Sequence, residues 1–270
     1  MKWREERGRA FYSARQSDLL VFGKLFAMLD KIRSFCIIDV MVYQDVTDEL
    51  KRLASEKFAS DDKYRARHER VVNTKLPLYG VMTPPLRALA KRIKCEYPEF
   101  IDDFFSRETY SFEEVLLCGW QLGKDYDENV RILKMIIPRM DSWAHPDQII
   151  GKFGWARDRD RLLSEFEYLR SGGEIEVRAY VMLMFTNFLD EKGLATVRRE
   201  LPAIPLGAYY IDMAVAWLLC EIVVKFYDIG IELLSEPYLT PWVVNKAISK
   251  CRDSYRLTAE QKEFLKTLKK

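Results

Sequence analysis

Histidine is scarce in this sequence, and its cysteines are scattered. The chain has two histidines, His68 and His145, and five cysteines that form no Cys-x-x-Cys pair. A His/Cys metal site or a serine–histidine–aspartate triad therefore has few possible members. An odd number of widely spaced cysteines inside apolar helical patterns is typical of reduced core residues. We expect a cytoplasmic protein, in which any catalysis relies on carboxylates, arginine or aromatic side chains.

The sequence also lacks an uncharged apolar run that would cross a membrane. The longest apolar stretch near the start, residues 19–43, is interrupted by five charged residues, whereas a spanning helix needs about 20 mostly uncharged residues. A secretory signal would need an apolar region followed by small residues at a cleavage site, and no such pattern is present. We therefore expect no membrane partner.

Neither sign of charge dominates. The 43 Lys and Arg and the 41 Asp and Glu leave a formal charge of +2, so a polyanion would have to be bound by a local basic face. The most basic segment is 241–270, although a solvated terminal helix would have a similar composition. No glycine-rich phosphate loop is present, which argues against an ATP-driven machine. The candidate phosphate-binding residues of the basic segment are Lys246, Lys250, Arg252 and Arg256.

Hairpin signals such as Asn-Gly and Asp-Gly are missing, whereas helix signals recur along the chain. The sequence therefore predicts an all-α fold. Helix starts are predicted from capping residues and a first-turn proline at Thr83-Pro84, Ser111 with Glu114, Asp127, and Thr258 with Gln261. Further helices are predicted at about 141–154, 158–170, 174–190, 193–202 and 208–226, the last of them apolar nearly all round and hence buried.

Helices of this size, joined by short turns, pair as αα-hairpins, and stacked hairpins bury a continuous core. The spacing of successive pairs is close to the ~40 residues of HEAT-type repeats. We predict a superhelical solenoid of HEAT-like αα-hairpin repeats over residues 41–270, with a helical bundle of different winding as the alternative. Residues 1–40 alternate basic and apolar side chains, which predicts an N-terminal extension with one amphipathic helix, either dispensable or capping the first repeat.

Three segments combine polar and aromatic side chains in unusual ways. Trp143 and Asp147 are four residues apart, so on a helix they share a face. A helix that begins at about His145 would place Asp147 in its first turn, where the helix dipole favours an ionised carboxylate. Arg178 lies in an early helical turn, and Trp217 lies in the most apolar helix. Each feature alone is more often structural: a helix-start carboxylate, a core tryptophan, or an arginine paired with a nearby carboxylate such as Glu174.

Five segments occur together in an order that resembles a known family. The sequence is similar to the bacterial DNA alkylation repair family of HEAT-like-repeat DNA glycosylases over about residues 41–270. The segments that carry the resemblance are LYGVMTPPLRALAKRI at 78–93, SWAHPDQI at 142–149, EVRAYVML at 176–183, YYIDMAVAWLL at 209–219 and NKAISKCRDSYR at 245–256.

The resemblance implies an enzyme that binds duplex DNA and hydrolyses the glycosidic bond of N3- or N7-alkylated purines, without a metal or organic cofactor. The family's aromatic-x-x-x-acid element falls on Trp143 and Asp147, its site arginine on Arg178, and its second site tryptophan on Trp217. The three residues between Trp143 and Asp147, Ala144-His145-Pro146, differ from the commonest family pattern.

In the expected mechanism Asp147 stabilises positive charge on the sugar, the two tryptophans face the sugar or the base, and Arg178 holds a phosphate. We expect a monomer. A non-catalytic helical-repeat module that binds damaged or branched nucleic acid is the alternative, and a protein-binding scaffold is a third possibility.

Overall fold

The computed structural model describes residues 41–150 and 159–270. The contacts of the chain divide it into two units, Met1–Met41 and Val42–Lys270. The helix expected within residues 1–40 and the end of the helix expected at 141–154 lie outside the described residues. Among the described residues there is no β-strand, only an isolated antiparallel bridge between Ala54 and Val81. The prediction of an all-α fold is confirmed.

Fifteen α-helices and three short 3₁₀ helices make up the described part of the unit Val42–Lys270. They are α2 (Tyr43–Leu53), α3 (Glu56–Ser60), α4 (Asp62–Val72), α5 (Thr83–Glu96), α6 (Phe100–Ser106), α7 (Phe112–Gly119), α8 (Tyr126–Ile136), η1 (Ile137–Arg139), α9 (Ala144–Ile149), α10 (Arg159–Glu165), η2 (Glu167–Ser171), α11 (Glu174–Asn187), α12 (Leu194–Glu200), η3 (Leu201–Ala203), α13 (Tyr209–Lys225), α14 (Tyr227–Leu234), α15 (Pro241–Asp253) and α16 (Ala259–Thr267).

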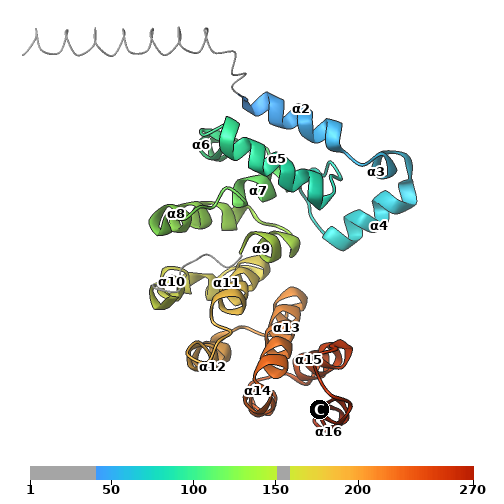
Figure 1. Ribbon diagram of the computed structural model, residues 1–270, viewed down its shortest axis with the longest axis vertical. Helices are drawn as coiled ribbons and strands as arrows, with labels where there is room; N and C mark the ends of the chain where they lie inside the picture. The colour runs from blue at the N-terminus through green and yellow to red at the C-terminus, as the bar shows by residue number, and fades with distance from the viewer. Residues whose placement is uncertain (1–40, 151–158) are drawn as a thin grey trace, which may run out of the picture. The chain divides into compact units, whose positions relative to one another are not determined.

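Within this unit the helices form two layers. In one layer α5, α7, α9, α11, α13 and α15 follow one another, and each contacts the next. Helices α6, α8, α10, α12 and α14 lie on the other side of that row (Figure 1). The core fills the space between the layers, and α13 is buried on nearly every side, as its sequence predicts. In the described part of the chain, no helix is both long and apolar enough to cross a membrane.

Capping residues predict the helix starts well, with two small errors. Ser111 and Glu114 form the capping box of α7, and Thr258 and Gln261 form that of α16. Thr83 is the first helical residue of α5 and not its cap, because Met82 occupies the N-cap position with extended backbone. Asp127 is likewise inside α8.

The true cap of α8 is Asp125, whose carboxylate accepts the Glu128 N–H. The helix expected at 141–154 begins later, at Ala144, because the Asp141 carboxylate accepts hydrogen bonds from Thr74, Lys75 and Leu76 and is part of a loop contact. The cysteines divide as well: Cys118, Cys220 and Cys251 are buried thiols as expected, whereas Cys95 is exposed.

Two carboxylates, the buried Glu113 and the partly buried Asp141, fix the segment that joins α4 to α5. Helix α4 ends at Val72, and its C-cap residue Asn73 adopts a left-handed backbone with φ 50°. Further along, the Glu113 carboxylate accepts the backbone N–H groups of Tyr79, Gly80 and Val81 at 2.8–3.2 Å. The Glu113 bonds hold the residues before α5 against α7, and the Asp141 contacts hold the segment just after α4 against the start of α9. This contact builds one wall of the cavity described next.

Candidate active site

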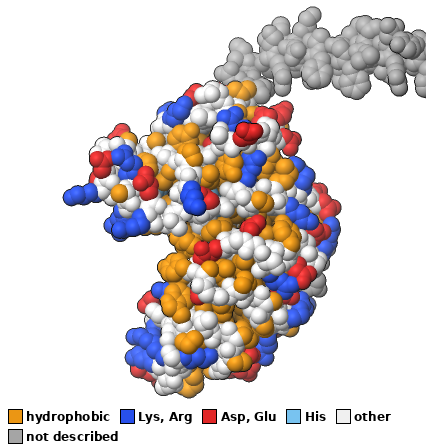
Figure 2. Space-filling model, turned by 180° about the vertical axis from the view of Figure 1, so that it is seen from behind, with side chains coloured by type: hydrophobic (Ala, Val, Ile, Leu, Met, Phe, Trp, Pro, Cys, Tyr) orange, Lys and Arg blue, Asp and Glu red, His pale blue; other side chains and the backbone are white. Residues whose placement is uncertain are grey.

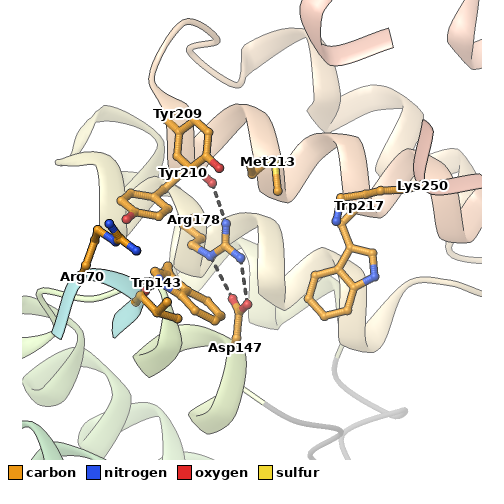
Figure 3. A pocket seen from close by; sticks show the side chains of 10 residues that line it. Arg70, Trp143, Asp147, Arg178, Tyr209, Tyr210, Met213, Trp217 and Lys250 are labelled. Carbon is orange, nitrogen blue, oxygen red and sulfur yellow. Dashed lines mark hydrogen bonds and ion pairs between the residues drawn. The ribbon is translucent and has the colours of Figure 1, made fainter. Parts of the chain in front are cut away.

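A cavity of about 550 Å³ opens between α4, α9, α11, α13 and α15. It collects four residues that the sequence singles out, Trp143, Asp147, Arg178 and Trp217, together with one predicted phosphate-binding residue, Lys250 (Figure 3). Residues that are up to 180 positions apart in the chain, from Arg70 to Lys250, therefore meet at one place. The remaining lining residues are Arg70, Val71, Tyr209, Tyr210 and Met213.

Asp147 lies in the first turn of α9, as its sequence predicts. The helix is held in place by His145, whose ring is fully buried. The ring nitrogen Nε2 lies 3.2 Å from the Phe112 carbonyl, and Nδ1 accepts the Asp141 N–H. Burial lowers the pKa of His145 to about 4, since the charged ring would lose its hydration. A neutral histidine therefore anchors the helix that carries the carboxylate.

Arg178 makes a two-point ion pair with Asp147. Nε donates to Oδ1 at 2.8 Å and Nη2 to Oδ2 at 2.7 Å, while Nη1 donates to the Tyr210 carbonyl at 2.6 Å. The side chains of Arg178 and Asp147 are only 6% and 11% exposed. Glu174, the partner suggested by the sequence, instead accepts the Tyr210 N–H. This geometry disfavours the phosphate contact expected of Arg178, because its guanidinium already serves protein acceptors on two other helices.

The two tryptophans line the cavity from different elements, since Trp143 is the N-cap residue of α9 and Trp217 lies on α13. The indole N–H of Trp143 donates to the Val71 carbonyl at 2.7 Å, which ties the ring to the end of α4. The ring of Trp217, on α13, packs on Phe185 with centroids 4.5 Å apart. In the view of Figure 3 the Asp147 carboxylate lies between the two indole rings. Both rings are half-buried, so each combines a packing contact with a surface toward the cavity.

Sequence reasoning missed the contribution of α4. Arg70 lines the cavity, and Lys63 and Arg67 precede it by seven and three residues, so all three lie on one face of the helix. All three are exposed, and none of them forms an ion pair with another described residue. The spacing of the three cations can be read from the sequence, but α4 also carries acidic residues, so its composition does not suggest a basic face. One of these acidic residues, Asp62, binds Arg65 and lies on a different face of the helix.

The predicted basic residues of the C-terminal segment separate in the structure. Lys250 lines the cavity, and Lys246 lies one turn before it on α15. Arg252 is exposed and does not line the cavity, and Arg256 is paired with Glu221 at 2.7 Å beside a neighbouring hollow of about 440 Å³. Figure 2 shows Lys and Arg side chains gathered on both sides of a recess that exposes hydrophobic side chains.

Comparisons of the chain with protein-family models, curated proteins and solved structures found no match. Within residues 41–150 and 159–270, no three His, Cys, Asp or Glu side chains cluster closely enough to hold a metal ion. The cavity itself combines a fixed carboxylate, two aromatic rings and cations at the rim.

Proposed function

We propose that this protein is a DNA glycosylase that hydrolyses the N-glycosidic bond of purines alkylated at N3 or N7. The observation that carries the proposal is the Asp147 carboxylate, held by Arg178 in an open cavity that Trp143 and Trp217 also line. The resemblance of the five sequence segments to alkylation repair glycosylases supports the same activity.

The chemistry of the lesion fits such a cavity. A purine alkylated at N3 or N7 carries a formal positive charge and leaves as a neutral base, so its departure needs no general acid. Positive charge then builds on the deoxyribose in an oxocarbenium-like state. A fixed carboxylate next to the sugar stabilises that state more than the ground state. The proposal assigns this role to Asp147, which would also orient the attacking water.

Pairing with Arg178 leaves Asp147 able to act. A carboxylate has about four lone-pair sites, and the two bonds from Arg178 occupy two of them. The remaining sites can face a water molecule or the developing positive charge. Arg178 is thereby a positioning residue, because it fixes the angle of the carboxylate through two parallel bonds. Contact with a DNA phosphate is then assigned to exposed cations and not to Arg178.

The aromatic walls suit a cationic substrate. The π face of an indole attracts a positive charge with about 0.5–2 kcal/mol, depending on how much water is displaced. Trp143 and Trp217 would offer such faces to the sugar or to the alkylated base. A neutral lesion would gain neither this attraction nor an easy departure, so the proposal predicts poor excision of neutral bases.

DNA binding is assigned to the cations at the rim of the cavity. Arg70 on α4 and Lys250 on α15 lie on different helices that border it, and Lys63 and Arg67 extend the row along α4. Such residues provide the salt-dependent part of DNA affinity by displacing counterions from the phosphates. We further infer that the two helical layers form a HEAT-like solenoid, because each helix of one layer contacts the next in chain order.

The direct test is release of free base. Purified protein is incubated with a duplex that contains one 7-methylguanine, and free base and abasic sites are both measured. We expect release from this duplex and none from the same duplex with guanine or with uracil at that position. Absence of 7-methylguanine release at saturating protein would refute the activity.

One observation favours the alternative, a nucleic-acid-binding module without catalysis. Both oxygens of Asp147 accept bonds from Arg178, and a carboxylate paired in this way also serves to hold two helices together. In that case the protein would bind the 7-methylguanine duplex but leave its glycosidic bond intact. Binding and release measured on the same duplex separate the two functions.

A further inference from the structure

Two large aromatic side chains are exposed beside the cavity. Tyr209, in the first turn of α13, is 59% exposed, and Trp242, in the first turn of α15, is 43% exposed. Their ring centroids are 6.0 Å apart and their planes are inclined by 64°. We call this pair the aromatic shelf. Neither ring is needed to fill the core, so packing alone does not explain why two such residues are exposed together.

The aromatic shelf is connected to the cavity directly through Tyr209 and indirectly along α15, the helix that carries Trp242. Tyr209 itself lines the cavity. Trp242, Lys246 and Lys250 follow one another at intervals of four residues, so they form one stripe along α15. Lys250, at the far end of this stripe, also lines the cavity. A ligand that extends from the cavity over Tyr209 therefore meets the ring of Trp242, and Lys246 and Lys250 lie along the same helix as that ring.

Aromatic rings and nearby cations are the two elements that bind single-stranded nucleic acid. Bases stack on the rings whatever their sequence, and the cations contact the phosphates between them. Inside a duplex the faces of the bases are covered by their neighbours, so an exposed ring can stack only on a base that is unpaired or unstacked. Lys246 is one turn from Trp242, which places a positive charge close to a stacked nucleotide.

We infer that the aromatic shelf binds an unpaired base of a DNA strand whose neighbouring nucleotides lie at the cavity. The preferred ligand is then DNA with a short single-stranded segment beside the lesion, such as a gap or a bubble, and not a fully paired duplex. This inference rests on the proposed function for the identity of the ligand as DNA. It adds a stacking site for which the excision chemistry has no need.

The test is a binding measurement on three labelled DNAs with the full-length protein. All three share the same paired arms: one is fully paired, one has a five-nucleotide single-stranded thymine gap, and one has the same gap built from abasic units. The abasic gap keeps the phosphates and flexibility but removes the stacking faces. We expect the thymine gap to bind about fivefold to tenfold more tightly than the abasic gap at equal salt, as expected for stacking of one base.

Variants assign the difference to the shelf. Trp242→Ala should reduce the preference for the thymine gap to less than twofold, and Trp242→Phe should retain most of it because a ring remains. Tyr168→Ala is the matched control, since Tyr168 is also about half exposed but lies on η2 and does not line the cavity. Far-UV circular dichroism of each variant checks that its helices are intact.

Equal affinity for the thymine and abasic gaps, or an unchanged preference in the folded Trp242→Ala protein, would overturn the inference. The proposed activity is judged separately by base release. If the wild-type protein releases 7-methylguanine but binds the thymine and abasic gaps equally, only the inference about the aromatic shelf is wrong. If it prefers the thymine gap but releases no base, only the proposed glycosylase activity is wrong.

Discussion

Arg178 and Asp147 form a two-point ion pair that joins α11 to α9, with both N–O distances between 2.7 and 2.8 Å. Because the pair is almost entirely buried, removing one partner leaves an unpaired charge in a medium that solvates it poorly, at a cost of about 3–5 kcal/mol. Substitutions that keep the size of the side chain and change only its charge or its bonding geometry are therefore the informative ones. The same pair also aims the carboxylate on which the proposed activity depends.

Asp147→Asn should lower the rate of 7-methylguanine release at least about tenfold, which corresponds to ~1.4 kcal/mol of transition-state stabilisation. The amide keeps the shape of the side chain but removes the negative charge that would face the sugar. Duplex affinity should change little, because Asp147 does not contribute positive charge. Single-turnover release and fluorescence anisotropy measure the two quantities. Asp127→Asn, at an exposed carboxylate paired with Arg161, is the control; equal release by the two variants would remove Asp147 from the mechanism.

Arg178→Lys and Arg70→Ala should differ in their effect on DNA binding. Arg178 is buried against protein acceptors, so its replacement should slow base release but leave the salt dependence of duplex affinity unchanged. Arg70 is exposed at the rim, so its loss should weaken binding and reduce the slope of log K against log salt by about 1. Titrations at several salt concentrations measure both slopes. A reduced slope in the Arg178 variant would restore the phosphate contact that the geometry disfavours.

His145 should make the protein less stable as the pH falls from 7 to 5. Its pKa is about 4 in the folded state, below the ordinary 6.5, because burial disfavours the charged ring. The unfolded chain therefore binds more protons in this range, and stability is lost as the pH drops below 6.5, by about 2 kcal/mol at pH 5. Urea unfolding of the wild type and of His145→Gln at both pH values isolates this contribution. The same pH dependence in both proteins would contradict it.

Glu113→Ala should be among the most destabilising single substitutions outside the cavity. Three backbone N–H groups in the segment before α5 would lose their acceptor. The buried N–H groups of Gly80 and Val81 could not form hydrogen bonds with water instead. We expect a loss of about 3 kcal/mol or more in the free energy of unfolding. Glu113→Gln keeps one acceptor oxygen and should lose less. Glu128→Ala, at an exposed carboxylate paired with Arg131, should change stability by less than about 1 kcal/mol.

Local signals in the sequence predict most of the helices but not every boundary. The capping boxes of Ser111 and Thr258 are correct because both partners of each lie within four residues. The start of α9 is predicted too early, because Asp141 is engaged by a loop some 66 residues away. No local pattern contains that information. The error at Asp127 is smaller and shows two acidic residues competing for one cap, which Asp125 takes.

The candidate site is predictable in its residue types but not in its contacts. The spacing of Trp143 and Asp147 indicates a shared helix face, and both do line one cavity. The ion-pair partner of Arg178 is not predictable in this way. The sequence suggests the nearby Glu174, whereas in the structure Arg178 binds Asp147. Long-range pairing depends on how successive helices stack, which periodicity within a single helix does not reveal. Arg70 is missed for the same reason.

The cavity is assembled from helices that span the chain from Arg70 to Lys250. In a solenoid of the kind proposed above, each helix pair contacts only its neighbours, so a pair can be added or removed without disturbing the others. Here that freedom is restricted to the ends. Loss of any helix pair between α4 and α15 would separate walls that now face each other, whereas a pair added beyond α15 would leave them in place. The lineage of such a chain should therefore vary in length at its termini and keep a constant number of helices in between.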